Sequence, residues 1–416
     1  MSANGDENGH GGIIQARIHH DIQTPLAESR NDTRSNASFT PPLHTAGRYI
    51  VDANGERYKL ASVNWYGASD VDFVPGGLDF RHRDDLAATI KAMGFNSVRF
   101  PYSDQMVLEN PIVPVKLISA NLDLLDGYEL AYDNTLQWEH DQQGPRALDV
   151  FKACVDSLTD AGLTVIINDH ITNAQWCDGK NLCDSSWKNS HFGPICKVKQ
   201  TTESWIENWK TIMRPHINNP LVIGADLRNE PRGLWGTMTW DMFASACEKA
   251  SEALLKLNPD WLMFVEGVSS ANDCSGARLR PIQLSIPDRV VYSSHIYSWS
   301  GWGSLGKTYG RRPYESFARD MDKNWGYLLA SNTAPVWAGE FGAPDHAQGH
   351  DRHYWDNLMR YLLDWDVDFG YWALNPRKPN LERESYGLLE DDWETPIAGD
   401  YRLVDMHKLM KGREKE

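Results

Sequence analysis

The sequence contains no uninterrupted apolar run approaching about 18 residues, the length that a membrane-spanning helix requires. Its first residues, MSANGDENGHGG, are polar and lack the apolar segment of a signal peptide. Positive charge is also in short supply, because 41 Lys and Arg residues face 57 Asp and Glu residues and the formal net charge is −16. Nucleic acids and anionic membrane surfaces bind through basic footprints, so both are disfavoured as partners.

Cysteine is scarce, with 6 in 416 residues. Cys154 and Cys247 lie at apolar positions of helix-like segments and are expected to be buried thiols. The others lie in polar loops and are Cys177, Cys183, Cys196 and Cys274. Four loop cysteines indicate two disulfides and an oxidising compartment, with three pairings equally open. A zinc site is the alternative, although no paired C-x-x-C motif with matching histidines is present.

Residues 1–44 are rich in Asn, Ser, Asp, His and Gly, which predicts a disordered N-terminal tail. Two N-glycosylation triplets begin there, at Asn31 and Asn36, and would be used only in the secretory pathway. Together with the loop cysteines they favour an extracellular protein, although no signal peptide is visible in the chain. Residues 45–412 are expected to form one catalytic domain.

Short apolar runs alternate with amphipathic segments along that domain. The segment ALDVFKACVDSLTDAG, for example, places Leu148, Phe151 and Val155 on one helical face. Strands are predicted at 58–67, 95–103, 163–171, 222–230, 261–267, 290–297, 334–342 and 368–375, and helices at 82–94, 147–162, 202–217, 239–257, 314–331 and 352–365. This alternation favours a closed eight-stranded parallel β/α barrel. An open doubly wound sheet is the alternative, but no G-x-G-x-x-G motif follows the first strand.

Polar and aromatic residues stand where these strands end. They are Asn64, Trp65, Arg99, His170, Asn229, Glu230, Glu266, His295, Tyr297, Glu340 and Trp372. The carboxyl ends of barrel strands form the active face of this fold, and stability alone does not require polar residues there. The pattern therefore predicts a functional site at the barrel mouth.

Two of these residues suggest the chemistry. Glu230 ends the fourth strand and Glu340 the seventh, so their carboxylates can face each other across the mouth. Glycoside cleavage needs such a pair, with one acid for the leaving oxygen and one base or nucleophile for the anomeric carbon. Pro231 stops the strand because it has no N–H to donate, and Asn229 can hold a sugar hydroxyl, plausibly the 2-OH.

The ordered set of motifs resembles glycoside hydrolase family 5. Asn229-Glu230-Pro231, His295-x-Tyr297 and Glu340-Phe341-Gly342 follow successive strands in the expected order, with an arginine and a tryptophan at strands two and eight. The resemblance covers about residues 47 to 400. It implies that Glu230 is the acid/base and that Glu340 is the nucleophile of a retaining mechanism needing no cofactor or metal.

The resemblance also implies supporting roles. Arg99 would keep Glu340 ionised and Tyr297 would bond to it. His170 and His295 would bind hydroxyls near the scissile bond or support the acid/base, and Trp372 would form a platform under the sugar. Asn64 and Trp65 are further candidates for substrate binding or support. Glu266 is interpreted as structural or peripheral, and Trp205 and Trp209 as packing.

Several stretches, including VNWYGA and NWGYLLASNTAPVWAGEFG, resemble endo-β-1,4-glucanases, so a β-linked glucan is the expected substrate and a monomer the expected oligomeric state. The loop PRKPNLERESYGLLEDDW departs from that pattern, which leaves a β-mannanase, an exo-β-glucanase or a glycoconjugate-acting β-glycosidase as alternatives. A non-catalytic sugar-binding barrel and a metal-dependent lyase are alternatives of other classes. Loop aromatics that could form outer subsites are Trp176, Trp235, Trp299 and Trp302.

Overall fold

Eight parallel strands close into a barrel in the computed structural model, which describes residues 39–127, 144–233, 237–301 and 307–411. The strand order is β10-β3-β4-β5-β6-β7-β8-β9, so the first and last barrel strands lie side by side. The strands are β3 (Ala61–Asn64), β4 (Ser97–Ser103), β5 (Thr164–Ile171), β6 (Val222–Asp226), β7 (Leu262–Glu266), β8 (Val290–Ile296), β9 (Val336–Phe341) and β10 (Asp368–Tyr371). The predicted β/α barrel is confirmed.

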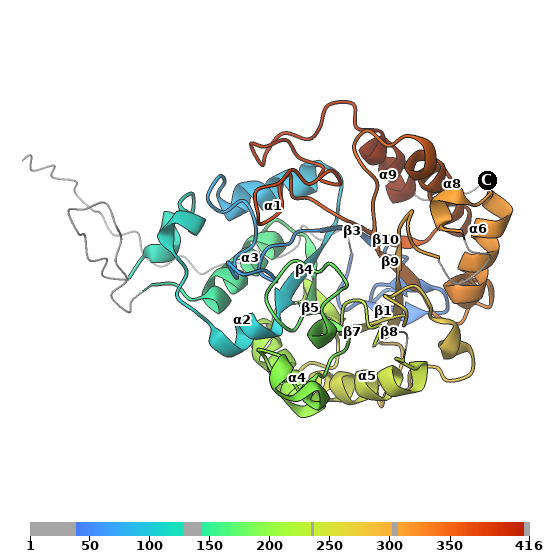
Figure 1. Cartoon of the computed structure of the whole chain (residues 1–416), viewed down its shortest axis with the longest axis horizontal. Coiled ribbons are helices and arrows are strands. Elements are labelled where there is room, and N and C mark those ends of the chain that lie inside the picture. Colours follow the sequence, from blue (N-terminus) through green and yellow to red (C-terminus); the bar gives the residue numbers. More distant parts are fainter. Residues whose placement is uncertain (1–38, 128–143, 234–236, 302–306, 412–416) are drawn as a thin grey trace, which may run out of the picture. The chain divides into compact units, whose positions relative to one another are not determined.

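Helices surround this barrel (Figure 1). They are α1 (Arg83–Ala92), α2 (Asp104–Glu109), α3 (Ala147–Asp160), α4 (Thr202–Met213), α5 (Trp240–Leu255), α6 (Tyr314–Met321), α7 (Tyr327–Ala330), α8 (Gly349–Trp365) and α9 (Tyr401–Lys411). A π-helical turn at Asp322–Gly326 joins α6 to α7. In α3 the predicted apolar face is buried against the barrel, and Gly162 follows the helix with φ +80°, a conformation that other residues rarely adopt.

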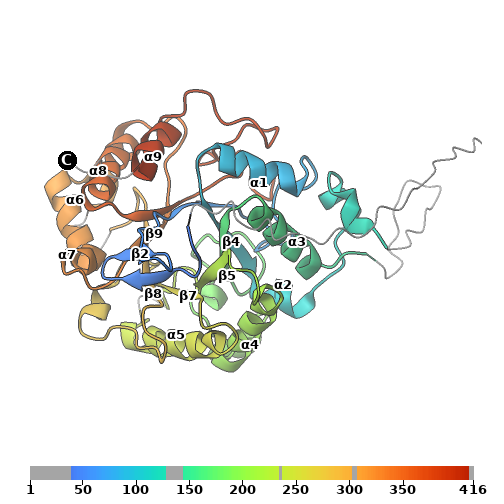
Figure 2. The same ribbon diagram turned by 180° about the vertical axis from the view of Figure 1, so that it is seen from behind.

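A short hairpin covers the N-terminal end of the barrel. Its strands, β1 (His44–Ala46) and β2 (Tyr49–Val51), pair antiparallel and lie on the face turned towards the reader in Figure 2. Leu43 and Ile50 pack with Phe264, Val291 and Trp337 in an apolar cluster at this end of the barrel. The opposite end, where the strands finish, is therefore the open end.

The last residues assigned to the N-terminal tail are among those that the structure describes. Residues 39–44 were predicted to belong to the tail, yet Leu43 is buried and the ring of Phe39 lies 4.5 Å from that of Tyr58. Composition did not predict these contacts, because Phe39 and Leu43 are two apolar residues in a segment that is otherwise mostly polar. Asn31 and Asn36 lie outside the described residues. Within those residues, no helix is long and apolar enough to cross a membrane.

The prediction of two disulfides is wrong. One is present, between Cys183 and Cys196. Cys274 is a buried thiol 3.4 Å from the carbonyl oxygen of Ser293, and Cys177 is a thiol facing Asn229. The polar loop sequence around Cys274 did not indicate disulfide formation, because Cys274 itself packs beneath its loop. With two of the loop cysteines bonded to each other, the four do not form the alternative zinc site. Cys154 and Cys247 are buried thiols, as predicted.

Candidate active site

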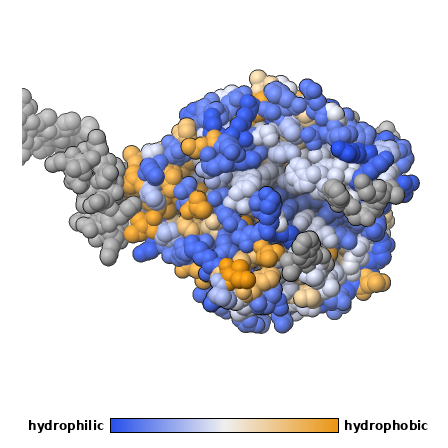
Figure 3. Space-filling view, viewed as in Figure 1, coloured by the Kyte–Doolittle hydropathy of each residue, from blue (hydrophilic) through white to orange (hydrophobic). Residues whose placement is uncertain are grey.

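A cavity of about 880 Å³ lies at the open end of the barrel. Glu230 and Glu340 line it from opposite sides of the strand ring, together with His170, Tyr297 and Trp372. The face seen in Figure 3 is largely hydrophilic, with hydrophobic residues mainly towards its left side. Leu108 of α2 and Leu122 are exposed, and neither lines the cavity.

Arg99 holds the floor of the cavity together. Its side chain, from β4, is fully buried and donates to residues of four other strands or strand ends. The acceptors are Asp226 Oδ2 at 2.7 Å, Asn64 Oδ1 at 3.0 Å, Asn229 Oδ1 at 2.9 Å, Glu266 Oε1 at 3.0 Å, and Glu340 Oε1. A planar guanidinium suits this task because its donors have a fixed geometry. Asn64 is thereby a supporting residue beneath the cavity.

Glu340 ends β9 and is almost fully buried. Its Oε1 accepts a hydrogen bond from Arg99, and its Oε2 accepts one of 3.0 Å from the hydroxyl of Tyr297. Burial raises the pKa of Glu340, while His295 and Arg99 act in the opposite direction. The predicted contacts of Arg99 and Tyr297 with Glu340 are present.

Glu230 approaches Glu340 from a different backbone setting. β6 ends at Asp226, so Glu230 lies beyond the sheet, with a φ of +46° that is unusual for a residue bearing a side chain. Its Oε1 lies 3.2 Å from His295 Nδ1. One oxygen of Glu230, one of Glu340 and a ring nitrogen of His295 lie within 4.8 Å of one another. Retaining glycosidases separate their two carboxyl groups by about 5–5.5 Å and inverting ones by about 6.5–9.5 Å, so the observed approach fits retention.

His295 and His170 differ in charge. Burial disfavours a charged His295, but Glu266, Glu340 and Glu230 outweigh it and hold its pKa well above the ordinary value. Burial, with Arg99 nearby, lowers the pKa of His170 well below its ordinary value. The His170 ring is neutral, and its Nδ1 donates to Asn168 Oδ1 at 2.9 Å, which leaves Nε2 as an acceptor for a sugar hydroxyl.

The donor set of Glu230, Glu340 and His295 could in principle hold a divalent cation. Glu340 already accepts from Arg99 and Tyr297, and a protonated imidazole is not a metal ligand. The positive charges beside these carboxylates are supplied by the protein itself, so the arrangement suits proton transfer and nucleophilic attack better than metal binding.

Aromatic rings extend the site. The Trp372 ring is parallel to that of Tyr66, at 4.9 Å and 7°, and to that of His170, at 5.4 Å and 10°. Trp176 and Trp299 also line the cavity, and Trp299 stacks on Tyr297 at 4.4 Å. Trp235 and Trp302 lie outside the described residues. Flat apolar rings beside polar groups are what a pyranose requires, since it presents C–H faces as well as hydroxyls.

Trp65 is a predicted site residue that lies away from the cavity and does not contact Glu230, Glu340 or Arg99 through its side chain. It is fully buried, donates to the carbonyl of Gly76 at 2.9 Å and packs on Phe100. Successive side chains leave a strand on opposite faces, so Asn64 points into the barrel and Trp65 into the surrounding layer. Trp205 and Trp209 are buried in α4, in agreement with their interpretation as packing residues.

Glu266 is the main residue that the sequence analysis undervalued. It is fully buried at the end of β7, where its Oε2 accepts a 2.6 Å hydrogen bond from the backbone N–H of Glu230. Its Oε1 lies 3.4 Å from His295 Nε2. Burial opposes its ionisation, but His295 and Arg99 outweigh that effect and lower its pKa. Glu266 is central to the site and not peripheral, and its position at a strand end was the available signal.

Comparisons with known proteins agree with this geometry. The family model described as "Cellulase (glycosyl hydrolase family 5)" matches residues 51–378. An endoglucanase of Paenibacillus polymyxa is 30% identical over 381 residues, which cover 86% of this chain and 85% of that protein. The major extracellular endoglucanase of Xanthomonas campestris pv. campestris is 27% identical over 368 residues, covering 83% of this chain and 67% of that protein.

Solved structures show the same fold. The catalytic domain of the major endoglucanase from Xanthomonas campestris pv. campestris superposes with a TM-score of 0.69 at 23% identity, covering 89% of this chain and all of that one. A cellotetraose complex of the endocellulase from Pyrococcus horikoshii superposes with a TM-score of 0.68 at 23% identity, with the same coverage. A glutamate after β6 faces one at the end of β9, the family model matches most of the barrel, and a relative is 30% identical. The chain therefore belongs to glycosyl hydrolase family 5 and is a cellulase-type, retaining β-glycoside hydrolase.

Proposed function

We propose that the protein is an extracellular endo-β-1,4-glucanase in which Glu340 is the nucleophile and Glu230 the acid/base. The observation that carries the assignment of roles is the difference in their surroundings. Glu340 accepts hydrogen bonds from Arg99 and Tyr297, which favour a carboxylate against the opposing effect of its burial, whereas the Glu230 side chain is 21% exposed and reaches into the cavity where a leaving oxygen would lie.

The reaction proceeds in two displacements. A carboxylate oxygen of Glu340 attacks the anomeric carbon as the glycosidic bond breaks, and Glu230 gives its proton to the departing oxygen. A water molecule then attacks the same carbon and passes a proton to Glu230, and the bond to Glu340 breaks. Asn229, fixed by its hydrogen bond to Arg99, is placed to hold the 2-OH of the sugar.

The choice of a β-1,4-glucan rests on the aromatic surfaces and on the relatives. Tyr66 and Trp176 line the cavity beside Trp372, and Trp299 lines it beside Tyr297, so a connected group of flat rings lies along the cavity that holds the two carboxylates. A polymer occupies several such stacking surfaces, whereas a single sugar needs only one. The relatives named endoglucanase support this reading, and the one named as a major extracellular endoglucanase supports export, as does the disulfide.

A substrate panel tests the proposal. The protein is incubated with carboxymethyl-cellulose, mixed-linkage glucan, glucomannan, galactomannan, laminarin and aryl β-glycosides, and reducing ends, product sizes and anomeric configuration are measured. We expect mixed cello-oligosaccharides with retained configuration. Release of single sugars only, cleavage of small glycosides alone, or inverted products would overturn it.

Three variants accompany the panel. Glu340→Gln should abolish turnover and leave folding intact, and Glu230→Gln should lower kcat on oligosaccharides by about 10²–10⁴-fold. Glu315→Gln, which alters an exposed glutamate in the first turn of α6, is the matched control and should retain activity. Trp299→Ala should weaken polymer binding by about tenfold, as expected for a lost stacking surface, with little change in kcat on a short aryl glycoside.

A further inference from the structure

A buried ionic cluster lies behind the cavity and plays no part in the two displacements. Arg228 Nη1 lies 3.3 Å from Asp104 Oδ2 and 3.2 Å from both carboxylate oxygens of Asp169. All three side chains have no exposed surface. We call these three residues the Arg228 cluster. Ions this deeply buried are costly, so the cluster calls for an explanation other than stability.

Three of the four carboxylate oxygens in the cluster have a donor besides Arg228. Gln200 and Asn208 donate to the two oxygens of Asp104, at 2.6 and 2.8 Å, and Trp205 Nε1 donates to Asp169 Oδ2 at 2.6 Å. The cluster is thereby fixed to α4 and to the loop before it. A buried polar network satisfied in this way is rigid, because each bond removes a rotamer that its members could otherwise adopt.

The cluster joins two strand ends that carry site residues. Arg228 directly precedes Asn229 and Glu230 in the sequence, and Asp169 directly precedes His170. The backbone N–H of Asn229 donates to the carbonyl oxygen of Asp169 at 2.9 Å. The segment after Asp226 is no longer part of β6. These contacts therefore take the place of the strand hydrogen bonds that would otherwise hold it.

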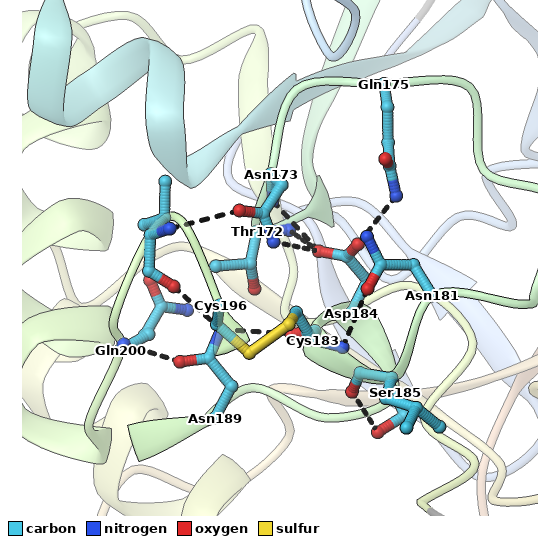
Figure 4. Close-up of a disulfide and its surroundings, with 12 residues drawn as sticks. Thr172, Asn173, Gln175, Asn181, Cys183, Asp184, Ser185, Asn189, Cys196 and Gln200 are labelled. Atoms are coloured by element: carbon cyan, nitrogen blue, oxygen red, sulfur yellow. Dashed lines mark hydrogen bonds between the residues drawn. A yellow bond between two sulfur atoms is a disulfide. The ribbon is translucent and has the colours of Figure 1, made fainter. Parts of the chain in front are cut away.

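A disulfide-closed loop holds the same segment from outside. Arg228 Nη2 donates to the carbonyl oxygen of Asp184 at 3.3 Å, and the backbone N–H groups of Arg232 and Gly233 donate to that of Ser185 at 3.0 and 2.8 Å. Asp184 and Ser185 follow Cys183, which is bonded to Cys196 (Figure 4). The Asp184 carboxylate in turn accepts from the backbone N–H groups of Thr172 and Asn173, just beyond β5.

We propose that Arg228 is a positioning residue for the acid/base step, acting through the backbone of Asn229 and Glu230; this rests on the role proposed above for Glu230. Its guanidinium ties the segment to Asp169 and to the disulfide-closed loop, and so sets where the Glu230 carboxyl group lies relative to the leaving oxygen. A displacement of about 1 Å of a catalytic group can cost about 10²-fold in rate.

The charges of the cluster identify which partner is needed. Two carboxylates share one guanidinium away from water, and burial raises the pKa of both, that of Asp104 well above its ordinary value. Arg228 Nη1 contacts both carboxylate oxygens of Asp169 but only one of Asp104, so Asp169 is the carboxylate that depends more on this cation. An asparagine at position 104 preserves this arrangement, whereas loss of Arg228 leaves the Asp169 carboxylate buried without its cation.

The test separates acid catalysis from general damage by using two leaving groups. Cellotetraose needs a proton on the departing oxygen, whereas the dinitrophenolate of 2,4-dinitrophenyl β-cellobioside departs without one. For Arg228→Met we expect kcat/KM to fall about 100-fold on cellotetraose and less than about threefold on the aryl glycoside. Arg228→Lys should restore part of the loss, and Asp104→Asn should behave like the parent enzyme.

Controls make each outcome decisive. Arg402→Lys alters another fully buried arginine, paired with Asp400, and should change both substrates by the same factor. Equal losses on both substrates in folded Arg228→Met, or no loss, would overturn the proposal. If Arg228→Met does not fold, the same comparison is decided by Arg228→Lys and Asp169→Asn. Glu230→Gln must itself show the leaving-group dependence; if it does not, the role proposed for Glu230 fails separately.

Discussion

The backbone N–H of Glu230 donates a 2.6 Å hydrogen bond to the carboxylate of Glu266, so the end of β7 fixes the residue that follows β6. Glu230 has a φ of +46°, a conformation that neighbouring contacts must maintain. The same Glu266 carboxylate faces His295, whose other ring nitrogen faces Glu230. Glu266 thus acts on Glu230, the proposed acid/base, both through the backbone N–H of Glu230 and through the imidazole of His295.

Glu266→Gln should lower kcat by about 100-fold, because it removes a preorganised charge from the site. The amide oxygen can still accept from the N–H of Glu230, but the negative charge beside His295 is lost. Because that charge helps to keep the imidazole protonated, His295 should titrate at lower pH in the variant. The measurements are kcat on cello-oligosaccharides and the NMR titration of His295. An unchanged titration together with parental kcat would contradict this account.

Asp226 predicts a pH dependence of stability. Burial raises its pKa to about 8, with Glu266 acting in the same direction and Arg99 opposing. Since the folded-state pKa lies above the unfolded value, this contribution is fully present below about pH 4 and is lost as pH rises through about 8. Asp226→Asn should lack this pH-dependent loss. As pH rises to 8, its free energy of unfolding should fall by at least about 2 kcal/mol less than that of the parent enzyme.

Urea denaturation of the parent enzyme and of Asp226→Asn at pH 5 and pH 8 measures this difference. Asp226 lies beside Arg99 and Asn168, so activity is recorded in parallel to separate stability from function. Equal slopes with pH in the two proteins would refute the assignment of a raised pKa to Asp226.

The disulfide gives a third prediction. Cys183 and Cys196 are separated by 13 positions, and closing a loop of this size stabilises a fold by about 3 kcal/mol through the entropy of the unfolded chain. Cys183→Ser should lower the free energy of unfolding by about that amount. Alkylation of the denatured, unreduced protein should label four cysteines and leave two unlabelled. Labelling of only two cysteines would show that a second disulfide is present.

The barrel could be predicted from the sequence because its signals are local. Each strand is a short apolar run, and helices such as α3 show a buried face at helical spacing and end at a glycine. The two glutamates could be placed because a barrel fixes where strands end. Arg99 and Tyr297 then followed from the family resemblance, and their contacts with Glu340 are present.

The rest depended on contacts between distant segments. The sequence around Glu266 does not distinguish it from a glutamate that merely ends a strand. Its importance comes from its hydrogen bond with the backbone N–H of Glu230, 36 positions earlier. The direction of Trp65 depends on where β3 begins within a longer apolar run. The pairing of Cys183 with Cys196, and not with Cys274, depends on how the loop folds back on itself.

The hairpin at the base of the barrel has a consequence for synthesis of the chain. Thr45 donates to the carbonyl oxygen of Asp288 at 3.0 Å, and Leu43 and Ile50 pack on Trp337. The hairpin segment therefore meets these partners only after the roughly 240 residues between Thr45 and Asp288 have been made, because sequence-distant contacts form late. Until then the apolar base is open to solvent. We expect chaperones to protect the hairpin segment of the growing chain for longer than the segments that pair locally.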